Sequence, residues 1–439
     1  MLRQGFFFVH LEIFLCENLS IMSRILLLSM MMLFSLLNID AQDIKIIQKG
    51  SDWQLLIDQK PFFIKGVVGH TYLEKVKAYG GNSVRIGYKK EELDRAEQLG
   101  LKALVNLPAN AERYGMDYND NEAVKQQTEE IVEIVKQAKD HPAVLMWSIG
   151  NELDYIPGTK PFNPKVWDAV NQAARAIKEI DPAHPIMTVI GISMMEKVTD
   201  IFRRCPDLDL LGINSYGDIY TVRDTLKKRG WHKPYLIAEW GPDGYWEVKK
   251  TKWGAPYEQT GREKLNAYEQ KYRKAIENGN CLGSFVFYWY HKQETTHTWF
   301  SMFDEKAQET PLPKLMKMLW TGECDKNLAP VVDSLNIDKW VRYQDIRLKP
   351  GSQHQARATA SDPDKDKITY KWEIRPEAIY ASYAGQGEKE PQPIPGLIGE
   401  QKKSITFKTP DKTGAYRLYV YALDGNNQFS TANLPFYVE

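Results

Sequence analysis

The chain has no excess of charge of either sign. Lys and Arg together number 57, Asp and Glu also number 57, and the formal net charge of the 439 residues is zero. A nucleic-acid-binding domain is expected to carry a clear basic patch. The charge balance therefore argues against nucleic acid as a partner and fits a neutral ligand.

Cysteine is also scarce, with four in the whole chain. Cys16 lies near the N-terminus, and Cys205, Cys281 and Cys324 are widely spaced. Three cysteines in an exported protein allow at most one disulfide and leave a free thiol. None has the spacing of a metal-binding motif, and we assign them no catalytic role.

No apolar run is long enough to span a membrane, which takes about 20 residues. The apolar run from 25 to 37 follows Met22 and a basic residue, and it precedes Ala41, a plausible cleavage point. This pattern is typical of an export signal. We expect residues 1–41 to be a signal peptide with an upstream extension, translation starting at Met1 or Met22, and a periplasmic or secreted protein.

Aromatic residues are abundant, with 12 Trp and 23 Tyr. Most of them are expected in cores. Their flat apolar faces with a polar tip also suit the binding of sugar rings.

Residues 60–320 alternate between short β-rich runs and amphipathic helical segments. The runs are nearly continuously apolar, which is typical of parallel strands buried on both faces. Eight such units predict a (β/α)8 TIM barrel. A doubly wound open sheet is the runner-up, but "GVVGHTY" after the first run lacks its glycine-rich fingerprint. The runs are 62–69, 82–87, 101–108, 143–152, 185–191, 208–217, 234–241 and 282–289.

The pattern changes after the eighth unit. Residues 331–439 form short alternating segments separated by turn clusters, and they resemble immunoglobulin-like modules of the polycystic-kidney-disease type. We expect a barrel domain over 42–325, with a hairpin at 43–61 that closes its bottom, and a β-sandwich over 326–439. The aspartates at 362, 364 and 366 could bind calcium, but a solvated turn explains them better.

Two of the eight runs end in a carboxylate, Glu152 in "SIGNE" and Glu239 in "LIAEWG". Catalytic groups of TIM barrels project from the C-terminal ends of strands, and strands four and seven face each other across the barrel mouth. Glycosidic bond hydrolysis needs such a pair, one group as acid and one as nucleophile or base. The distance between the two carboxylates decides between retention and inversion.

The segments "HPAVLMWSIGNE" and "PYLIAEWG" resemble the clan A glycoside hydrolases, and especially the family 2 catalytic barrel. The resemblance implies that Glu152 is the acid/base, that Glu239 is the nucleophile, and that the anomeric configuration is retained. Hydrolysis by two carboxylates requires no metal, and we expect no cofactor.

Four more positions match this resemblance. It implies that Arg85 in "SVRIG" lies beside the nucleophile and that Asn151 bonds the sugar 2-hydroxyl. It also implies that Tyr216 in "INSYG" orients the nucleophile and that Trp289 is a platform under the bound ring.

The domain order departs from family 2, whose members usually carry β-sandwiches before the barrel. A barrel with a trailing immunoglobulin-like domain looks more like family 158 of the same clan, the endo-β-1,3-glucanases. We therefore expect a retaining endo-β-1,3-glucanase. The alternatives are an exo-acting β-glycosidase of the β-galactosidase or β-mannosidase type, a β-glucan transglycosylase, and a sugar-binding protein without activity. The presence of both Glu152 and Glu239 argues against the last of these.

Loops at the expected catalytic face supply further candidates for substrate binding. Trp246 and Trp299 could stack on sugar rings, and His70 could bond sugar hydroxyls. A row of aromatics suggests a cleft for a polysaccharide or oligosaccharide. We expect the protein to be a monomer.

Overall fold

The structure is a computed structural model that describes residues 42–154, 163–378 and 387–439. The expected signal peptide lies outside the described residues. Asp43–Glu439 forms one compact unit. Within the described ranges, the helices are all too short or too polar to cross a membrane.

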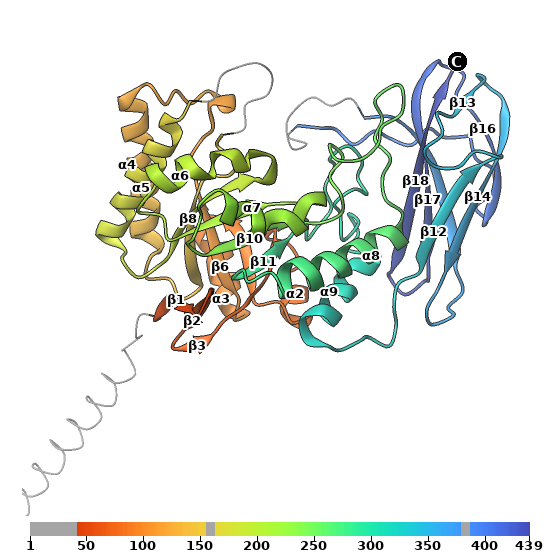
Figure 1. Cartoon of the computed structure of the whole chain (residues 1–439). Helices are drawn as coiled ribbons and strands as arrows, with labels where there is room; N and C mark the ends of the chain where they lie inside the picture. Colours follow the sequence, from red (N-terminus) through yellow and green to blue (C-terminus); the bar gives the residue numbers. More distant parts are fainter. Residues whose placement is uncertain (1–41, 155–162, 379–386) are drawn as a thin grey trace, which may run out of the picture. The chain divides into compact units, whose positions relative to one another are not determined.

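Eight parallel strands close into a barrel in the order β10-β11-β4-β5-β6-β7-β8-β9. This confirms the predicted TIM barrel, and each strand lies within one of the apolar runs. Figure 1 labels four of the strands, β6, β8, β10 and β11. The strands are β4 (Ile64–Val68), β5 (Ser83–Gly87), β6 (Lys102–Leu107), β7 (Val144–Ile149), β8 (Ile186–Gly191), β9 (Leu210–Asn214), β10 (Tyr235–Trp240) and β11 (Gly283–Val286).

Helices follow the strands, and several begin at a side-chain cap. Asp120 accepts hydrogen bonds from two backbone amides at the start of α4, and Thr260 and Glu263 form a capping box at α8. The helices are α2 (Leu73–Ala78), α3 (Lys90–Gln98), α4 (Asn121–Ala138), α5 (Lys165–Ile180), α6 (Val198–Arg204), α7 (Val222–Lys228), α8 (Gly261–Lys271) and α9 (Pro311–Thr321).

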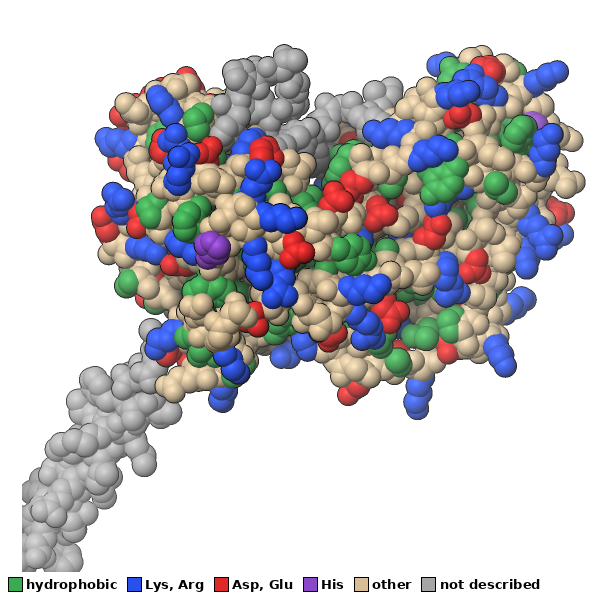
Figure 2. All heavy atoms as spheres, viewed as in Figure 1, with side chains coloured by type: hydrophobic (Ala, Val, Ile, Leu, Met, Phe, Trp, Pro, Cys, Tyr) green, Lys and Arg blue, Asp and Glu red, His purple; other side chains and the backbone are tan. Residues whose placement is uncertain are grey.

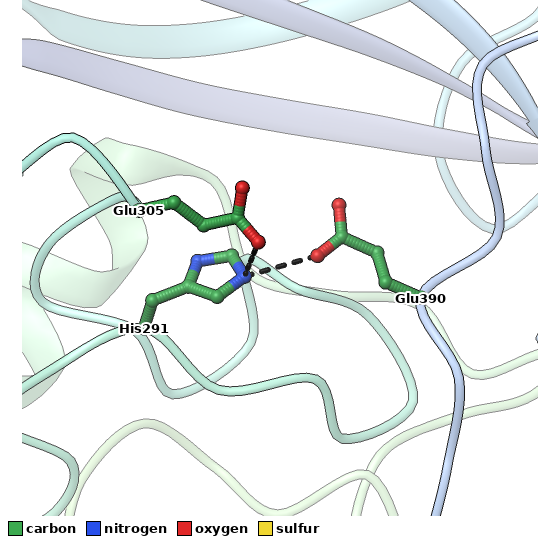
Figure 3. Close-up of side chains that lie close together, drawn as sticks. All are labelled: His291, Glu305 and Glu390. Carbon is green, nitrogen blue, oxygen red and sulfur yellow. Dashed lines mark hydrogen bonds and ion pairs between the residues drawn. The ribbon is translucent and has the colours of Figure 1, made fainter.

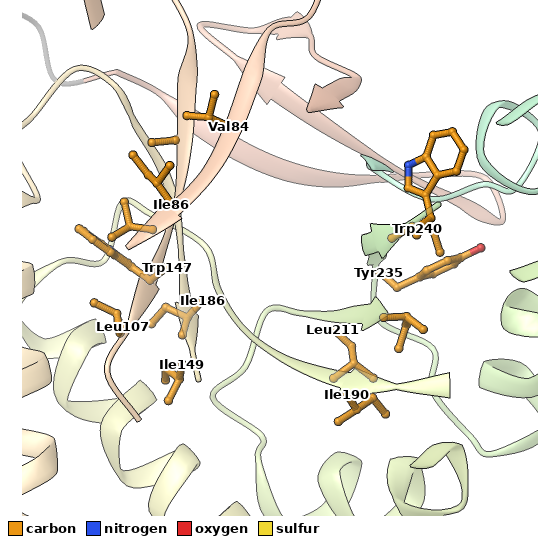
Figure 4. Close-up of a cluster of buried hydrophobic side chains, with 14 of the residues drawn as sticks. Val84, Ile86, Leu107, Trp147, Ile149, Ile186, Ile190, Leu211, Tyr235 and Trp240 are labelled. Carbon is orange, nitrogen blue, oxygen red and sulfur yellow. The ribbon is translucent and has the colours of Figure 1, made fainter. Parts of the chain in front are cut away.

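The barrel has two apolar layers because side chains alternate between the two faces of each strand. The layer between strands and helices includes Val84, Ile86, Trp147 and Trp240 (Figure 4). A second cluster holds side chains from the other face of the same strands, among them Leu104, Leu145, Leu236 and Phe285.

A small antiparallel sheet precedes the barrel: β1 (Ile44–Lys49), β2 (Asp52–Ile57) and β3 (Lys60–Pro61). Ile44, Leu55 and Ile57 are buried in the same cluster as Ile64, which opens the first barrel strand. The predicted hairpin therefore covers the end of the barrel where the strands begin.

The C-terminal region consists of a three-stranded sheet, β12-β14-β16, and a four-stranded sheet, β13-β18-β17-β15. One buried cluster contains side chains from both sheets, such as Ile337 and Phe407 from the first and Leu418 and Phe436 from the second. This is the predicted β-sandwich. Its strands are β12 (Val331–Ile337), β13 (Arg347–Leu348), β14 (Gln353–Ser361), β15 (Thr369–Pro376), β16 (Ser404–Lys408), β17 (Gly414–Leu423) and β18 (Phe429–Val438).

Polar side chains join the sandwich to the barrel. Arg417 of β17 donates to the carbonyl of Pro256, 3.0 Å away, and Asn433 of β18 donates to Glu258 at 2.6 Å. Arg262 of α8 pairs with Asp333 of β12 at 2.9 Å. Barrel and sandwich therefore share buried hydrogen bonds, as expected for parts of one compact unit.

The surface mixes charges of both signs. On the face in Figure 2, Lys and Arg side chains are interspersed with Asp and Glu. In the sandwich, Asp362 accepts hydrogen bonds from the backbone amides of Asp364 and Asp366, so this cluster has the contacts of a turn. Cys205 and Cys281 are buried free thiols, and Cys324 is exposed.

Candidate active site

Arg85 points into the barrel because of strand alternation. Its neighbours on β5, Val84 and Ile86, both belong to the layer between strands and helices. The side chain between them must face the opposite way. Arg85 is buried there, with 3% of its surface exposed, and a buried guanidinium requires charged or hydrogen-bonding partners.

Glu239 owes its orientation to an irregularity in β10. Ile237 pairs with Ile213 of β9, whereas Glu239 pairs with the next residue, Asn214, so β10 has one extra residue at Ala238. Ile237 and Trp240 both face the helices, although they are three residues apart. The bulge thus places Ala238 and Glu239 consecutively on the inner side, a common device beside active sites.

Arg85 and Tyr216 hold the two oxygens of Glu239. Arg85 Nη1 donates to Glu239 Oε1 at 2.9 Å, and the Tyr216 hydroxyl donates to Oε2 at 3.1 Å. Tyr216 is buried, and burial, followed by the charge of Glu239, raises its pKa well above the usual value. The phenol therefore stays protonated and serves as a fixed donor.

Glu152 follows β7 through a turn in the left-handed region. Gly150 has φ 68° and Glu152 has φ 47°, a conformation that glycine adopts freely and other residues rarely do. The Glu152 amide donates to Val189 O at 2.8 Å, and Arg113 donates to its carbonyl. At Gly191, an added Cβ would lie 3.1 Å from Glu152 Oε1, so the glycine leaves room for the carboxylate.

Glu152 is protonated more readily than an ordinary glutamate. Burial raises its pKa from 4.5 to about 7, with a further contribution from the negative charge of Glu239. Asn214 Nδ2 donates to Glu152 Oε1 at 2.8 Å, which opposes that rise. A carboxyl with a pKa near neutrality can both give and take a proton.

An amide network connects the two carboxylates. Arg85 Nη2 donates to Asn151 Oδ1 at 2.7 Å, and Asn214 Nδ2 donates to the same oxygen at 3.1 Å. Arg85 Nε donates to Asn106 Oδ1 at 3.1 Å. The sequence analysis missed Asn106 and Asn214, although each is a polar residue near the C-terminal end of an apolar strand, which was the available signal.

The structure contradicts the role expected for Trp289. Its side chain is fully buried, its indole N–H donates to Tyr72 O at 3.3 Å, and its ring stacks on Trp320. β11 ends at Val286, so the first position beyond the strand is Phe287, whose amide bonds Trp240 O at 2.8 Å. Phe287 is half-buried and packs edge-on against Tyr216, so the aromatic ring beside Tyr216 at this strand end is that of Phe287 and not that of Trp289.

Trp299 is also buried, with 1% of its surface exposed, and its indole N–H donates to Asp243 O at 2.9 Å. It therefore supports the loops and cannot present a face to a sugar, contrary to our expectation. Trp246 is 50% exposed and packs edge-on against Tyr216, with ring centroids 5.3 Å apart. His70 is exposed and lies 4.0 Å from Glu92, without a contact to Glu152 or Glu239 in the described residues.

A further carboxylate lies close to this group. Glu294 is buried, and burial raises its pKa to about 7. The negative charge of Glu239 also raises this pKa, whereas the positive charge of Lys292 lowers it. Lys292 Nζ is 3.4 Å from Glu294 and 5.8 Å from the ring centre of Phe287. No pattern in the sequence distinguishes Glu294 from its neighbours.

His291 and His297, in the loop after β11, belong to an ion-pair network. His291 Nε2 lies 3.0 Å from Glu390 and 3.8 Å from Glu305 (Figure 3). These three residues have the donor atoms of a metal site, but Arg375 also pairs with Glu390. His297 is buried and bonds Tyr421. The network links the loop after β11 to the sandwich.

Comparison with known proteins agrees with this geometry. Residues 92–254 match the family model described as glycosyl hydrolases family 2, TIM barrel domain. A β-glucuronidase of Streptococcus agalactiae serotype V is 24% identical over 287 residues, which are 53% of this chain and 45% of the relative. The mouse (Mus musculus) β-glucuronidase is 23% identical over 264 residues, 56% of this chain and 37% of the relative. The chain thus spans less than half the length of these curated relatives.

Among solved structures, β-glucuronidase 2 of Bacteroides uniformis, covalently bound to cyclophellitol-6-carboxylate aziridine, is similar with a TM-score of 0.52. The alignment covers 90% of this chain and 48% of that one at 13% identity, and it therefore concerns the fold alone. Together with the family match over residues 92–254, it shows that the barrel is similar to the family 2 glycosyl hydrolase TIM barrel.

Proposed function

We propose that the protein is a retaining β-glycoside hydrolase in which Glu239 is the nucleophile and Glu152 the acid/base. One observation carries the proposal: the two carboxylates sit in opposite environments. Arg85 and Tyr216 donate to Glu239, whereas burial raises the pKa of Glu152 to about 7. Two carboxyl groups in contrasting environments are the arrangement that acid and nucleophile require.

In the first step, Glu239 attacks the anomeric carbon while Glu152 gives its proton to the departing glycosidic oxygen. A glycosyl ester on Glu239 and a free hydroxyl on the leaving sugar result. In the second step, Glu152 removes a proton from water, the water oxygen bonds to the anomeric carbon, and Glu239 leaves as a carboxylate. The amide of Asn151, held by Arg85, is placed to bond a hydroxyl of the sugar.

For the substrate, we propose a neutral β-linked polysaccharide cleaved internally, with β-1,3-glucan as the first choice. Two cations close to the carboxylates already have anionic partners, since Arg85 pairs with Glu239 and Lys292 with Glu294. An acidic sugar would have to compete with these pairs. The exposed ring of Trp246 beside Tyr216 offers a stacking surface for a neutral ring.

A second candidate is an exo-acting β-glycosidase. The curated relatives are β-glucuronidases. Lys292 Nζ lies 5.8 Å from the ring centre of Phe287 and 3.4 Å from Glu294. The carboxylate of an acidic sugar would replace Glu294 as the partner of Lys292. On this hypothesis, a single terminal sugar would be released. Transglycosylation by the same two Glu would instead give elongated products.

The test is to incubate the protein with laminarin, mixed-linkage glucan, cellulose, mannan and galactan, and with aryl β-glucosides, β-galactosides and β-glucuronides. Short oligosaccharides from laminarin support the endo-β-1,3 proposal, and monosaccharide alone supports the exo candidate. Activity must be lost in both Glu152→Gln and Glu239→Gln, and NMR of the first product must show the β-anomer. Hydrolysis of a polysaccharide that survives in either variant contradicts the assignment of the two Glu, whereas an aryl glycoside has a good leaving group and needs less help from Glu152.

We also propose that the protein is exported, on the basis of the apolar run that follows Met22 and precedes Ala41. The mature protein should then begin close to residue 42. Mass spectrometry of its N-terminal peptide, after expression from the full gene, tests this cleavage.

A further inference from the structure

A polar groove of about 710 Å³ lies next to the candidate active site. One wall is formed by the segment after β9 and the loop after β10, and the other by Arg342 and Tyr343 of the C-terminal region, with α8 between them. Gly217 at its edge follows Tyr216 directly, and Glu247 follows Trp246. Two residues of the groove lining are thus the direct chain neighbours of the two aromatic residues beside Glu239.

Helix α8 presents a polar face to this groove. Glu263, Asn266, Ala267 and Gln270 line it, and this spacing places them on one side of a helix. Asn266 and Gln270 are exposed, and their side-chain amides make no hydrogen bond to any other residue in the described part of the chain. Each amide can donate and accept, as recognition of sugar hydroxyls requires.

Exposed aromatic rings add a second kind of contact. Tyr220 is 47% exposed and Tyr343 is 46% exposed, and both line the groove. Tyr343 is fixed by an edge contact with Tyr257, at 5.1 Å between ring centres, and by Arg342. Such exposed tyrosine rings provide apolar faces for sugar rings.

The groove lining has an excess of negative charge: four carboxylates, Asp218, Asp243, Glu247 and Glu263, face two cations, Lys271 and Arg342. Asp243 pairs with Lys271 at 2.7 Å, and Glu263 pairs with Arg342. Glu247 accepts from the backbone amide of Gly217 at 2.8 Å. An anionic ligand would be repelled by this excess of negative charge, whereas a neutral polyhydroxyl ligand can use the remaining hydrogen-bonding capacity.

We propose that this groove is a second binding site for a neutral oligosaccharide segment, which holds a polymeric substrate beside the catalytic carboxylates. The chemistry of its ligand rests on the proposed function, but the site is separate from Glu152 and Glu239. Tyr220 and Tyr343 would stack on sugar rings, and Asn266 and Gln270 would bond their hydroxyls.

Binding is measured in the Glu239→Gln background, so that the glycan is not consumed, by affinity electrophoresis in gels that contain laminarin or mixed-linkage glucan. Tyr220→Ala and the double change Asn266→Ala with Gln270→Ala should each weaken binding about threefold to tenfold. Phe202→Ala removes an exposed aromatic ring outside the groove and should leave binding unchanged. Thermal unfolding identifies any variant that fails to fold, and the amide pair gives an independent test because its side chains have no partner to lose.

The outcomes separate this proposal from the catalytic one. If the wild-type protein hydrolyses a glycan of the panel and the groove variants bind it normally, the groove proposal is wrong and the catalytic one stands. If binding falls in the groove variants while the wild-type protein hydrolyses nothing, the groove proposal stands alone. Absence of both hydrolysis and binding with every glycan contradicts both.

Discussion

Arg85 and Glu239 form an ion pair inside the barrel, with 2.9 Å between Nη1 and Oε1, although strands β11 and β4 lie between their own strands. The side chain of Arg85 is 2% exposed, and the side chain of Glu239 is 16% exposed. The same guanidinium also holds Asn151 and Asn106. One side chain thus fixes Glu239, the proposed nucleophile, and Asn151, which precedes the proposed acid/base Glu152.

Arg85→Lys is expected to lower kcat/KM by about two to three orders of magnitude, because an ammonium cannot bond Glu239 and Asn151 with the fixed geometry of a guanidinium. The measurement is steady-state kinetics on the substrate found in the panel. Arg95→Lys is the matched control, since Arg95 pairs with Glu74 on the surface. Equal loss of activity in both variants would contradict a specific role for Arg85.

The pKa of Glu152, about 7, predicts how activity depends on pH. The first step needs a protonated Glu152, so kcat/KM should fall as the pH rises through about 7 and beyond. The alkaline limb of the kcat/KM profile measures this. A profile flat from pH 6 to 9 would exclude Glu152 as the group that donates the proton.

The same shift predicts a change in stability. Because the folded pKa of Glu152 lies above the usual 4.5, the folded protein binds a proton that the unfolded chain releases between these pH values. The associated stability is present below pH 4.5 and is lost as the pH rises through about 7. Glu152→Gln removes this loss. The difference in Tm between the variant and the wild-type protein should therefore shift in favour of the variant as the pH is raised from 5 to 8. Glu129→Gln, at an exposed site, should show no such trend.

The sequence predicted the barrel because each strand is a continuous apolar run, and this pattern does not depend on distant contacts. It also predicted which strand ends carry Glu152, Glu239, Arg85 and Tyr216, because strand ends of a closed barrel meet at one face. The bulge at Ala238 could not be predicted, since an extra residue in one strand is visible only against the pairing of its neighbours.

The errors concern aromatic residues in loops. Trp289 and Trp299 were expected to contact substrate, but both are buried. Burial of a loop residue depends on which other loops cover it, and these come from distant parts of the sequence. Trp246 is also a tryptophan in a loop, but it is exposed. Residue type alone therefore could not tell which of the three tryptophans is accessible to substrate.

This contrast predicts different effects of two similar changes. Trp246→Ala should raise KM about threefold to tenfold through loss of a stacking surface, with little change in Tm. Trp299→Ala should lower the free energy of unfolding by about 3–5 kcal/mol, because it empties a buried site. Kinetics and thermal unfolding of both variants check this. A large fall in Tm for Trp246→Ala would show that its ring is structural.

The hairpin at the start of the barrel allows a stability test. Leu55, 1% exposed, is buried in the cluster with Ile64, and Leu55→Ala should cost about 2–5 kcal/mol. Ile47 on the adjacent strand is 39% exposed, and Ile47→Ala should change stability by no more than about 0.5 kcal/mol. Urea unfolding measures both. Similar values for the two would mean that the hairpin does not seal the barrel.

Glu258 allows a test of the connection between barrel and sandwich. It is 2% exposed, and its carboxylate accepts from Lys264 at 2.6 Å, from Thr296 at 2.6 Å and from Asn433 of the sandwich at 2.6 Å. Burial alone would raise the pKa of Glu258, but the charge of Lys264 and these hydrogen bonds hold it below its usual value. The carboxylate is therefore charged in the folded protein at neutral pH.

Glu258→Gln should destabilise the protein by about 3–5 kcal/mol, because it leaves the Lys264 ammonium buried without its counter-charge. Glu269→Gln on the same helix is the control, since Glu269 pairs with Arg273 at the surface and such pairs contribute little. Because barrel and sandwich share the carboxylate, urea unfolding of the wild-type protein should show one transition. If Glu258→Gln splits it into two, the network couples the two parts; if the wild-type protein already unfolds in two steps, they are not coupled.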